Sequence, residues 1–437
     1  MNGGPLAIAQ VNASEEGGGA ERIARQLHGE FLRQGHDASL LVGRGEAAGP
    51  HVFPFPADGR TRLAHALAGP LRILDRQRGL ETFRYPATDR MLDALPREPD
   101  IVHMHNLHGG FFDLRVLPEL SRRYPTVLTL HDAWLLSGHC AHSLGCERWR
   151  TGCGACPDLT IYPSVRRDAT ARNWKRKGEI FRRSRLHVAT PSGWLAKKVE
   201  ASILAPAVED LRVIPNGVEL DIFRPGDPRA ARWELRLPAT GFLLLFVGSN
   251  VDASPFKDYA TARKAAARVA EILEQEVTLV VLGSAGADAR EGRMRIRHIP
   301  FQNDLSRIAR YYHACDLYVH AAHAETFPVT VLEALACGKP IVATAVGGIP
   351  EQVRSLVPGA EGGDRPTLEA ADATGILVAP ADSEALARAA ARLLEDAPLR
   401  LRLGGNAARD AKLRFDARHQ ASVYLEWYQT MRGARAP

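Results

Sequence analysis

Short apolar segments of strand length alternate along most of the chain with amphipathic segments whose apolar residues recur at helical spacing. Strands that are joined by helices run parallel within one sheet, and the helices cover both of its faces. We therefore expect an α/β fold built on parallel sheets. The predicted strands cover residues 5–11, 40–42, 101–105, 126–130, 186–189, 242–247, 277–282, 317–320 and 341–345.

The alternation stops near residue 213 and begins again near residue 242. Residues 216–225 are rich in turn formers and lack helical spacing, so they predict a linker. We expect two doubly wound, Rossmann-like domains with a cleft between them, the first over 1–218 and the second over 219–414. The helical segment 415–437 is expected to cross back to the first domain. Residues 44–95 show no clear pattern, and residues 359–367 predict a surface loop.

The composition is typical of a globular protein, because 45% of the 437 residues are hydrophobic and 24% are charged. No apolar run approaches the ~20 residues of a membrane span. The N-terminal residues lack the basic and apolar regions of a signal peptide, so we expect a cytoplasmic protein. A net charge of +6 is modest for this length and does not indicate a nucleic-acid partner.

Basic residues crowd the segment 166–185, where only Asp168 and Glu179 oppose them. The segment could be a solvated basic face of a helix. It could also contact anionic lipid, as a peripheral attachment to the inner face of a membrane, or a phosphorylated acceptor.

Two carboxylates eight residues apart, Glu325 and Glu333, flank the expected start of a helix near Pro328. Small residues follow, the helix ends at Gly338, and an apolar strand begins shortly afterwards. The free N–H groups of a helix N-terminus suit a phosphate. A carboxylate on each side of a bound diphosphate can accept hydroxyls from two sugars. This arrangement predicts a nucleotide-sugar site.

The two glutamates, with the segment after them, resemble the E-x7-E motif of the retaining glycosyltransferases of family 4, which have the GT-B fold. Residues 213–218, Val-Ile-Pro-Asn-Gly-Val, and the terminal helix carry the same resemblance. The run from His131 to Cys140 resembles a subset of that family among the surface-polysaccharide transferases. The resemblance implies a hexosyltransferase that uses a UDP- or GDP-sugar and a glycan, lipid-linked or small-molecule acceptor.

The resemblance also implies roles for single residues. Glu333 would bind the ribose hydroxyls, Glu325 the hydroxyls of the sugar, and Lys257 the diphosphate. His131 would line the donor-sugar site, and we name His131, Glu325 and Lys257 as the catalytic candidates. The full set of donor-binding candidates is Gly18, Gly19, Ser249, Asn250, Lys257, Phe327, Val329, Thr330 and Glu333.

Several positions support or modify this assignment. Gly17-Gly18-Gly19 joins a strand to a helix, a turn that lets the backbone approach a phosphate. His103, His105 and Asn106 end a neighbouring strand and could contact acceptor hydroxyls. Ser249 stands where the family usually has arginine, and Asp258 and Pro328 replace common glycines. The charge of the leaving group would then depend on Lys257 and helix N–H groups.

No Asp-x-Asp pair lies at a convincing strand end, so we expect no obligatory catalytic metal. Three other functions stay open: a transferase of natural-product biosynthesis, an epimerase or phosphorylase on the same fold, and a non-catalytic sugar-nucleotide-binding protein.

Four of the six cysteines lie close together in the sequence, at Cys140, Cys146, Cys153 and Cys156. Clustered thiols in a cytoplasmic protein are typical of a metal site, and Cys153-x2-Cys156 is a chelating pair. We expect a structural zinc; reduced cysteines and disulfides are the alternatives.

Overall fold

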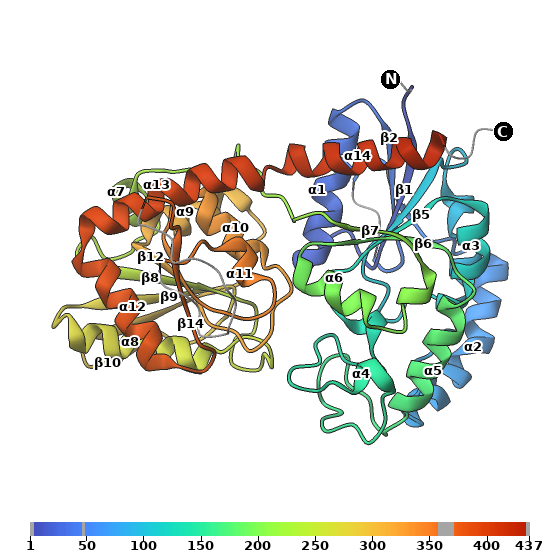
Figure 1. The fold of residues 1–437 in the computed structure, drawn as a ribbon, viewed down its shortest axis with the longest axis horizontal. Helices are drawn as coiled ribbons and strands as arrows, with labels where there is room; N and C mark the ends of the chain where they lie inside the picture. Colours follow the sequence, from blue (N-terminus) through green and yellow to red (C-terminus); the bar gives the residue numbers. More distant parts are fainter. Residues whose placement is uncertain (1–3, 46–48, 357–370, 434–437) are drawn as a thin grey trace. The chain divides into compact units, whose positions relative to one another are not determined.

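The computed structural model describes residues 4–45, 49–356 and 371–433. The surface loop predicted at residues 359–367 lies outside this range. The chain divides into two compact units (Figure 1). Unit 1 comprises Met1–Pro215 and Ala417–Pro437, and unit 2 comprises Asn216–Asp416.

Unit 1 is built on a seven-stranded parallel sheet with the order β3-β2-β1-β4-β5-β6-β7. Its strands are β1 Ala7–Asn12, β2 Asp37–Val42, β3 Val52–Pro54, β4 Ile101–Met104, β5 Thr126–Thr129, β6 Leu186–Thr190 and β7 Val208–Val213. Its α-helices are α1 Gly19–Arg33, α2 Gly59–Gln77, α3 Leu117–Arg123, α4 Arg148–Thr151, α5 Thr170–Phe181, α6 Gly193–Glu200 and α14 Ala417–Gly433. Short 3₁₀ helices occur at Pro86–Ala94, Leu114–Val116, Trp134–Leu136 and Ala205–Ala207.

Unit 2 repeats this plan with a seven-stranded sheet of order β10-β11-β9-β8-β12-β13-β14, in which β10 alone pairs antiparallel. Its strands are β8 Phe242–Val247, β9 Val277–Leu282, β10 Ala289–Glu291, β11 Met294–Ile299, β12 Leu317–His320, β13 Ile341–Thr344 and β14 Gly375–Val378. Its helices are α7 Pro228–Glu234, α8 Tyr259–Ile272, α9 Leu305–Ala314, α10 Val329–Ala336, α11 Ile349–Gln352, α12 Ser383–Glu395 and α13 Ala397–Arg414.

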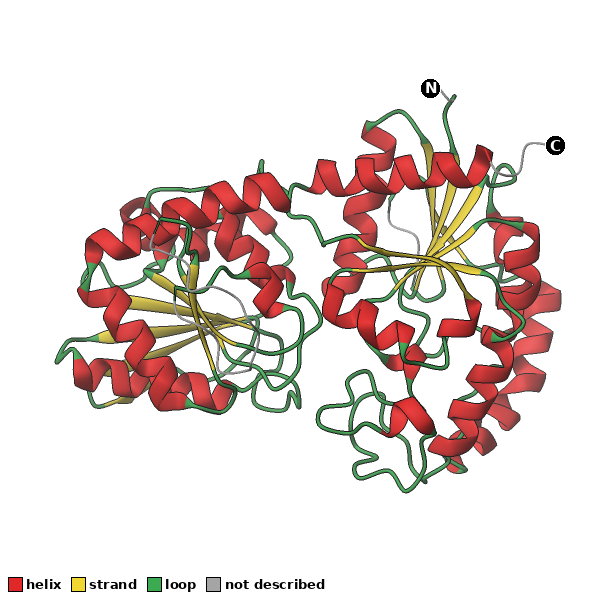
Figure 2. Cartoon of the chain, in the orientation of Figure 1, coloured by secondary structure: helices red, strands yellow, loops and turns green. Residues whose placement is uncertain are grey.

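Helices cover both faces of each sheet (Figure 2). The central strands are buried along their whole length, as in β1, β9 and β13, because both of their faces are covered. Each predicted strand is present with small changes at its ends. The prediction of two Rossmann-like α/β units is therefore confirmed.

The chain passes from unit 1 to unit 2 and returns through the last helix. Within unit 1, α14 is fixed to the sheet by Tyr424, whose hydroxyl lies 2.8 Å from Thr129 Oγ1, and by Trp427, whose Nε1 donates to Asp210. The two ends of unit 2 meet, because Val218 N–H donates to the carbonyl of Phe415 at 2.8 Å. No helix in the described residues is long and apolar enough to cross a membrane.

Candidate active site

The first strand of each unit marks the point where the order of its sheet reverses. In unit 1 the chain moves from β1 to β2 and β3, and later returns to place β4 on the other side of β1. In unit 2, β8 has β9 on one side and β12 on the other. Ligands of open α/β sheets bind at the carboxyl ends of the strands at such a point. The predicted site residues follow these strands in both units.

In unit 2, Lys257 and Glu325 form an ion pair. Lys257 follows the loop after β8, Glu325 follows β12, and Lys257 Nζ lies 2.5 Å from Glu325 Oε1. The two loops are fixed to each other, since Asp258 N–H donates to the carbonyl of Ala321 at 3.0 Å and His323 N–H to that of Phe256 at 2.8 Å. Both side chains keep about one sixth of their surface exposed, 17% and 16%, so a ligand can reach them.

His320, at the end of β12, completes this group. Its Nε2 lies 3.3 Å from Glu325 Oε1, and its Nδ1 lies 2.9 Å from the hydroxyl of Tyr318. Burial, and after it the charge of Lys257, lower the pKa of His320 to about 4. The ring is therefore neutral at physiological pH, and its Nε2 lies 3.3 Å from Lys257 Nζ as well as from Glu325 Oε1. Sequence reasoning missed His320, because a histidine at the end of an apolar strand carries no separate signal.

The charge of Glu325 is strongly stabilised. Burial alone would raise the pKa of its carboxyl, but Lys257 and His320 outweigh burial and hold the pKa well below its usual range. Glu325 is thus ionised at neutral pH and can only accept hydrogen bonds. This suits a group that binds sugar hydroxyls.

Gly347 sets the backbone beside Glu325. It follows β13 with φ of +56°, and a Cβ at this position would lie 1.7 Å from the carbonyl oxygen of Glu325. Any other residue would have to displace the loop that carries the carboxylate. Sequence reasoning did not single out Gly347, although the Val346-Gly347-Gly348 turn after a strand was a usable signal.

Glu333 lies on α10, which begins at Val329 next to Pro328, as predicted. Its side chain is buried, and one carboxylate oxygen accepts a 2.6 Å hydrogen bond from the hydroxyl of Tyr312. Burial, followed by the charge of Glu333, raises the pKa of Tyr312 well above its usual value. The helix has no side-chain cap at its N-terminus. Tyr312 is a second residue that sequence reasoning missed.

The other donor-binding candidates of unit 2 differ in their surroundings. Ser249 and Asn250 are exposed just after β8. The side chain of Phe327, in contrast, is buried and packs against Phe415, with ring centroids 5.9 Å apart. Phe327 can therefore contribute its backbone but not its ring. Thr330 lies in the first turn of α10, where its carbonyl accepts a hydrogen bond from Tyr312.

In unit 1 the glycine turn leads from β1 into α1 as predicted. Gly18 is the N-cap of α1 and provides no side-chain hydrogen bond, and Gly19 is the first residue of the helix. Both glycines are exposed. The turn thus presents backbone and the N-terminus of a 15-residue helix at the carboxyl end of the sheet.

His131 follows β5 and belongs to a series of hydrogen bonds between uncharged side chains. His105 Nδ1 lies 3.0 Å from His131 Nε2, and the amide nitrogen of Gln10 lies 3.3 Å from His105 Nε2. Burial lowers the pKa of His131 to about 4 and that of His105 well below its usual value, so both rings are neutral.

The donor and acceptor of each of these hydrogen bonds follow from Gln10. Gln10 can only donate through its amide nitrogen, so His105 accepts at Nε2 and donates from Nδ1–H to His131 Nε2. The remaining nitrogen of His131, Nδ1, must then carry the hydrogen. Because His131 is the partly exposed member, it offers a neutral N–H donor to a ligand oxygen.

His103, in contrast, belongs to the structure of unit 1. It is fully buried, its Nε2 lies 2.7 Å from Thr129 Oγ1, and its Nδ1 lies 2.6 Å from the hydroxyl of Tyr428 on α14. His105 is fully buried as well. The expectation that these two histidines contact an acceptor is therefore wrong, because both rings are enclosed and bonded within the sheet.

His108 and Asp132 form an ion pair that sequence reasoning missed. His108 Nε2 lies 2.7 Å from Asp132 Oδ2, and the backbone N–H of Trp134 donates to Asp132 Oδ1. Burial would lower the pKa of His108, but Asp132 outweighs it and the pKa is raised. Asp132 directly follows His131 in the sequence. It gives this edge of unit 1 a charged group next to a neutral donor.

Lys177 holds the segment that follows His131. Its ammonium is fully buried, lies 2.9 Å from Glu81 Oε2, and donates to the carbonyls of Trp134 at 2.8 Å and Ser137 at 3.1 Å. It also lies 3.7 Å from the centroid of the Trp134 ring. The interpretation of segment 166–185 as uniformly solvated is wrong at Lys177, which turns inward to bind this loop.

The four clustered cysteines are free, partly exposed thiols. Cys153 Sγ accepts a hydrogen bond from Gly138 N–H at 3.2 Å, and Cys156 Sγ lies 3.4 Å from His139 Nε2. Burial raises the pKa of Cys153 to about 11. Within the described residues, no three or more His, Cys, Asp or Glu side chains are arranged to hold a metal ion. The predicted zinc site is therefore not supported, because the thiols are engaged in separate contacts.

Two family models match the chain, one in each half. Residues 17–222 match glycosyltransferase family 4, and residues 227–410 match the glycosyl transferases group 1. Together with the fold, these matches identify the chain as a glycosyltransferase of the GT-B class.

Known proteins agree with this assignment. The chain is 25% identical over 363 residues to WcaC of Escherichia coli (strain K12), named as a colanic acid biosynthesis glycosyl transferase, with 77% of this chain and 82% of that protein covered. It is 37% identical over 155 residues to the D-inositol 3-phosphate glycosyltransferase of Mycobacterium leprae (strain Br4923), a match that covers 33% of this chain and 34% of that protein. The fold of Anabaena HepE is similar, with a TM-score of 0.64, 20% identity, and 97% and 99% of the two chains covered.

Proposed function

We propose that this glycosyltransferase moves a hexosyl group, with retention of configuration, from a nucleotide diphosphate sugar to a glycan or lipid-linked acceptor in polysaccharide biosynthesis. The observation that carries the proposal is the group of Lys257, Glu325 and His320 at the reversal point of the unit 2 sheet, next to the uncapped N-terminus of α10. The relatives support it: WcaC is named for colanic acid biosynthesis, and HepE was solved with UDP and glucose.

Each residue has a proposed part in binding the donor. Lys257 and the N–H groups at the start of α10 compensate the charge of the diphosphate. The carboxylate of Glu325 accepts hydrogen bonds from the transferred sugar, and Glu333 accepts them from the ribose. The contacts proposed for unit 1 are the neutral N–H of His131, to the sugar, and the backbone of Gly18 and Gly19, to the phosphates.

In the transfer step, the bond from the anomeric carbon to the diphosphate oxygen breaks, and a bond to the acceptor oxygen forms on the same face. The proton of the acceptor hydroxyl passes to the departing phosphate. No enzymic nucleophile is assigned, because Glu325 is engaged with Lys257 and with sugar hydroxyls. The charge on the leaving group is stabilised without an obligatory metal ion. The expected cytoplasmic location stays a prediction.

A panel of sugar nucleotides tests the proposal. We expect UDP- or GDP-sugars to raise the melting temperature. We also expect slow hydrolysis of these donors without acceptor, and a non-catalytic binding protein would not hydrolyse them. The product with an acceptor should keep the anomeric configuration of the donor, as read by NMR. An inverted product would contradict the retaining mechanism, and a chain that neither binds nor hydrolyses any of these donors would contradict the proposal as a whole.

A further inference from the structure

Helix α2 of unit 1 turns its apolar residues to solvent. Leu63 and Leu67 are 63% and 69% exposed, and Leu71 and Leu74 follow them at 45% and 38%. The spacing of four, four and three residues places all four leucines along one side of the helix. Thr61 is the one buried residue of α2. The usual arrangement of a surface helix, with its apolar stripe on the core, is thus reversed.

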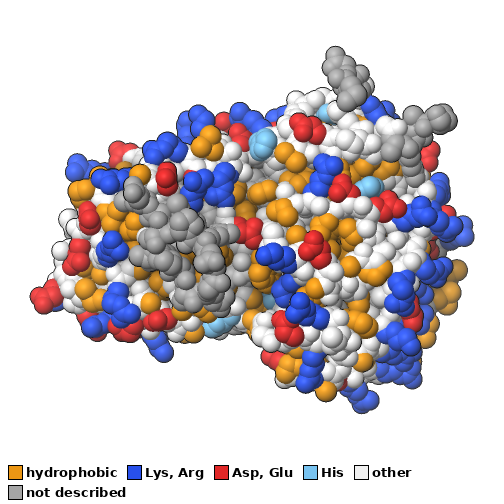
Figure 3. Space-filling view, in the orientation of Figure 1, with side chains coloured by type: hydrophobic (Ala, Val, Ile, Leu, Met, Phe, Trp, Pro, Cys, Tyr) orange, Lys and Arg blue, Asp and Glu red, His pale blue; other side chains and the backbone are white. Residues whose placement is uncertain are grey.

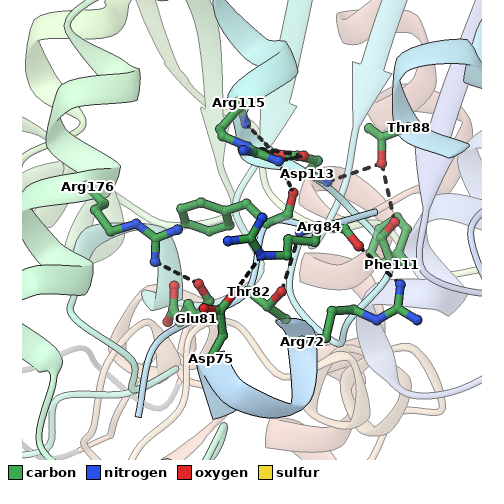
Figure 4. Close-up of polar contacts among 11 residues, drawn as sticks. Arg72, Asp75, Glu81, Thr82, Arg84, Thr88, Phe111, Asp113, Arg115 and Arg176 are labelled. Carbon is green, nitrogen blue, oxygen red and sulfur yellow. Dashed lines mark hydrogen bonds and ion pairs between the residues drawn. The ribbon is translucent and has the colours of Figure 1, made fainter. Parts of the chain in front are cut away.

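The opposite side of α2 is fixed to the protein by polar contacts (Figure 4). Asp75 pairs with Arg84 at 3.1 Å, and Arg72 donates to the carbonyl of Arg84 at 3.2 Å. Asp58 caps the helix by accepting from the N–H of Thr61 at 2.8 Å. Leu63 and Leu67 therefore bury little of their surface in unit 1, and their exposure requires a different explanation.

Arginines extend the leucine row at both ends. Arg60 precedes Leu63 by three residues and Arg78 follows Leu74 by four, so the same side of the helix carries them. In the part of the chain that the structure describes, Arg60 and Arg78 form no ion pair with a carboxylate.

The basic residues of α5 lie next to the end of α2. Asn173 on α5 donates to the carbonyl of Gly79 at 3.0 Å, and Arg176 donates to that of Glu81 at 2.8 Å. Lys and Arg side chains gather along this margin of unit 1 in Figure 3. The exposed basic residues of segment 166–185, which contains α5, are Arg166, Arg167, Arg172, Lys175, Arg182, Arg183 and Arg185.

A hollow of about 340 Å³ opens beside the helix. It is lined by Arg72 and Arg76 together with His65, Ile73 and Tyr85. Two guanidinium groups and a phenol hydroxyl form a set of donors that suits a phosphate oxygen. The hollow is thus a polar, cationic site on the side of α2 that faces away from the leucine row.

We propose that the α2 face, defined as Arg60, Leu63, Leu67, Leu71, Leu74 and Arg78, docks on the surface of a bilayer that contains anionic phospholipid. The leucines would enter the boundary between headgroups and acyl chains, and the arginines of α2 and the basic residues of α5 would contact the lipid phosphates. A second copy of the chain fits less well, since the arginines of two such faces would repel each other. The proposal does not depend on the proposed function.

Vesicle flotation tests the proposal on the full chain. The probes are phosphatidylcholine vesicles and vesicles in which about a third of the lipid is phosphatidylglycerol. We expect binding to the anionic vesicles that weakens as salt is raised, because the arginine contacts are screened. Leu63→Gln/Leu67→Gln should reduce partitioning by about tenfold or more. Arg60→Gln/Arg78→Gln should reduce it by about fivefold for each arginine at low salt.

The matched control is Leu401→Gln/Leu413→Gln on α13 of unit 2, two leucines that are 74% and 78% exposed. It should bind like the wild type, and thermal melts should show that all variants fold. The proposal would be overturned if the wild type did not bind anionic vesicles, or if the Leu63/Leu67 variant bound as well as the control. The proposal would also be overturned if the wild type were a dimer that does not bind vesicles and the Leu63/Leu67 variant were a monomer. The α2 face would then be the contact with a second copy of the chain.

Discussion

The two units share one sheet plan but carry different chemistry at the carboxyl ends of their strands. Unit 2 has an ion pair there, Lys257 with Glu325, which the neutral ring of His320 contacts. Unit 1 has the neutral pair of His105 and His131, followed by the ion pair of His108 with Asp132. The comparison indicates that a common fold fixes where these polar side chains lie, while the buried neighbours of each side chain decide its charge.

Unit 1 does contain a strong buried ion pair, but it supports a loop instead of lining the site. Lys177→Met would leave Glu81 buried without its partner and should lower the free energy of unfolding by about 3–5 kcal/mol. Lys175→Met, on the same helix but exposed, is the control and should change it by less than about 0.5 kcal/mol. Urea unfolding measures both. Similar small effects of the two variants would show that the pair contributes no stability.

The charge at the unit 2 site is best tested at Glu325. Glu325→Gln keeps the shape of the side chain but removes the charge that pairs with Lys257. We expect normal folding and a turnover reduced about a hundredfold, which is about 2.7 kcal/mol of barrier. Glu395→Gln, an exposed glutamate on α12, is the control. Wild-type turnover with unchanged donor affinity in Glu325→Gln would exclude Glu325 from the site.

The neutral histidines predict that unit 1 is sensitive to mild acid. The pKa of His103 is lowered from 6.5 to about 3 by burial. Below pH 6.5 the unfolded chain then binds more protons than the folded chain. The free energy of unfolding therefore decreases as the pH is lowered. The expected loss is about 2 kcal/mol between pH 6.5 and 5.

Calorimetry of His103→Gln measures this effect as the dependence of the melting temperature on pH. The variant should show a weaker dependence than the wild type, whatever its absolute stability. His419→Gln, which changes an exposed histidine on α14, should leave the dependence as it is. An unchanged dependence in His103→Gln would mean that the ring is not held neutral.

The smallest expected effect concerns the binding role of Lys257. Lys257→Ala should weaken nucleoside diphosphate binding about tenfold or more, because the contact with a charged group is lost, while nucleoside binding changes little. Titration calorimetry with both ligands gives the comparison, and Lys264→Ala, exposed on α8, is the control. Equal losses for the two ligands would indicate that Lys257 serves the fold through Glu325 and not the diphosphate.

Much of the fold could be predicted from the sequence because buried parallel strands are continuous apolar runs. The segments 242–247, 277–282 and 317–320 coincide with β8, β9 and β12. Helix α2 could not be predicted, since its apolar side faces solvent and its polar side faces the protein. The apolar residues of α2 therefore do not mark the side of the helix that packs on the protein.

The sequence could single out Glu325, Glu333 and Lys257 because a motif contains them, and their roles stay predictions; it could not single out residues that only the fold brings to the same place. His320, Tyr312 and His108 acquire their partners from other strands or loops. The cysteines show the opposite error: close spacing in the sequence suggested one metal site, whereas the thiols of Cys153 and Cys156 have separate contacts.

The bond between Val218 and Phe415 has a consequence for protein engineering. It holds the entry and exit of unit 2 together, so unit 2 is a continuous insert whose ends already meet. Replacing residues 216–416 with the corresponding insert of another transferase would leave both segments of unit 1 uncut. A set of such chimeras, each with the same unit 1, would test whether unit 2 selects the donor.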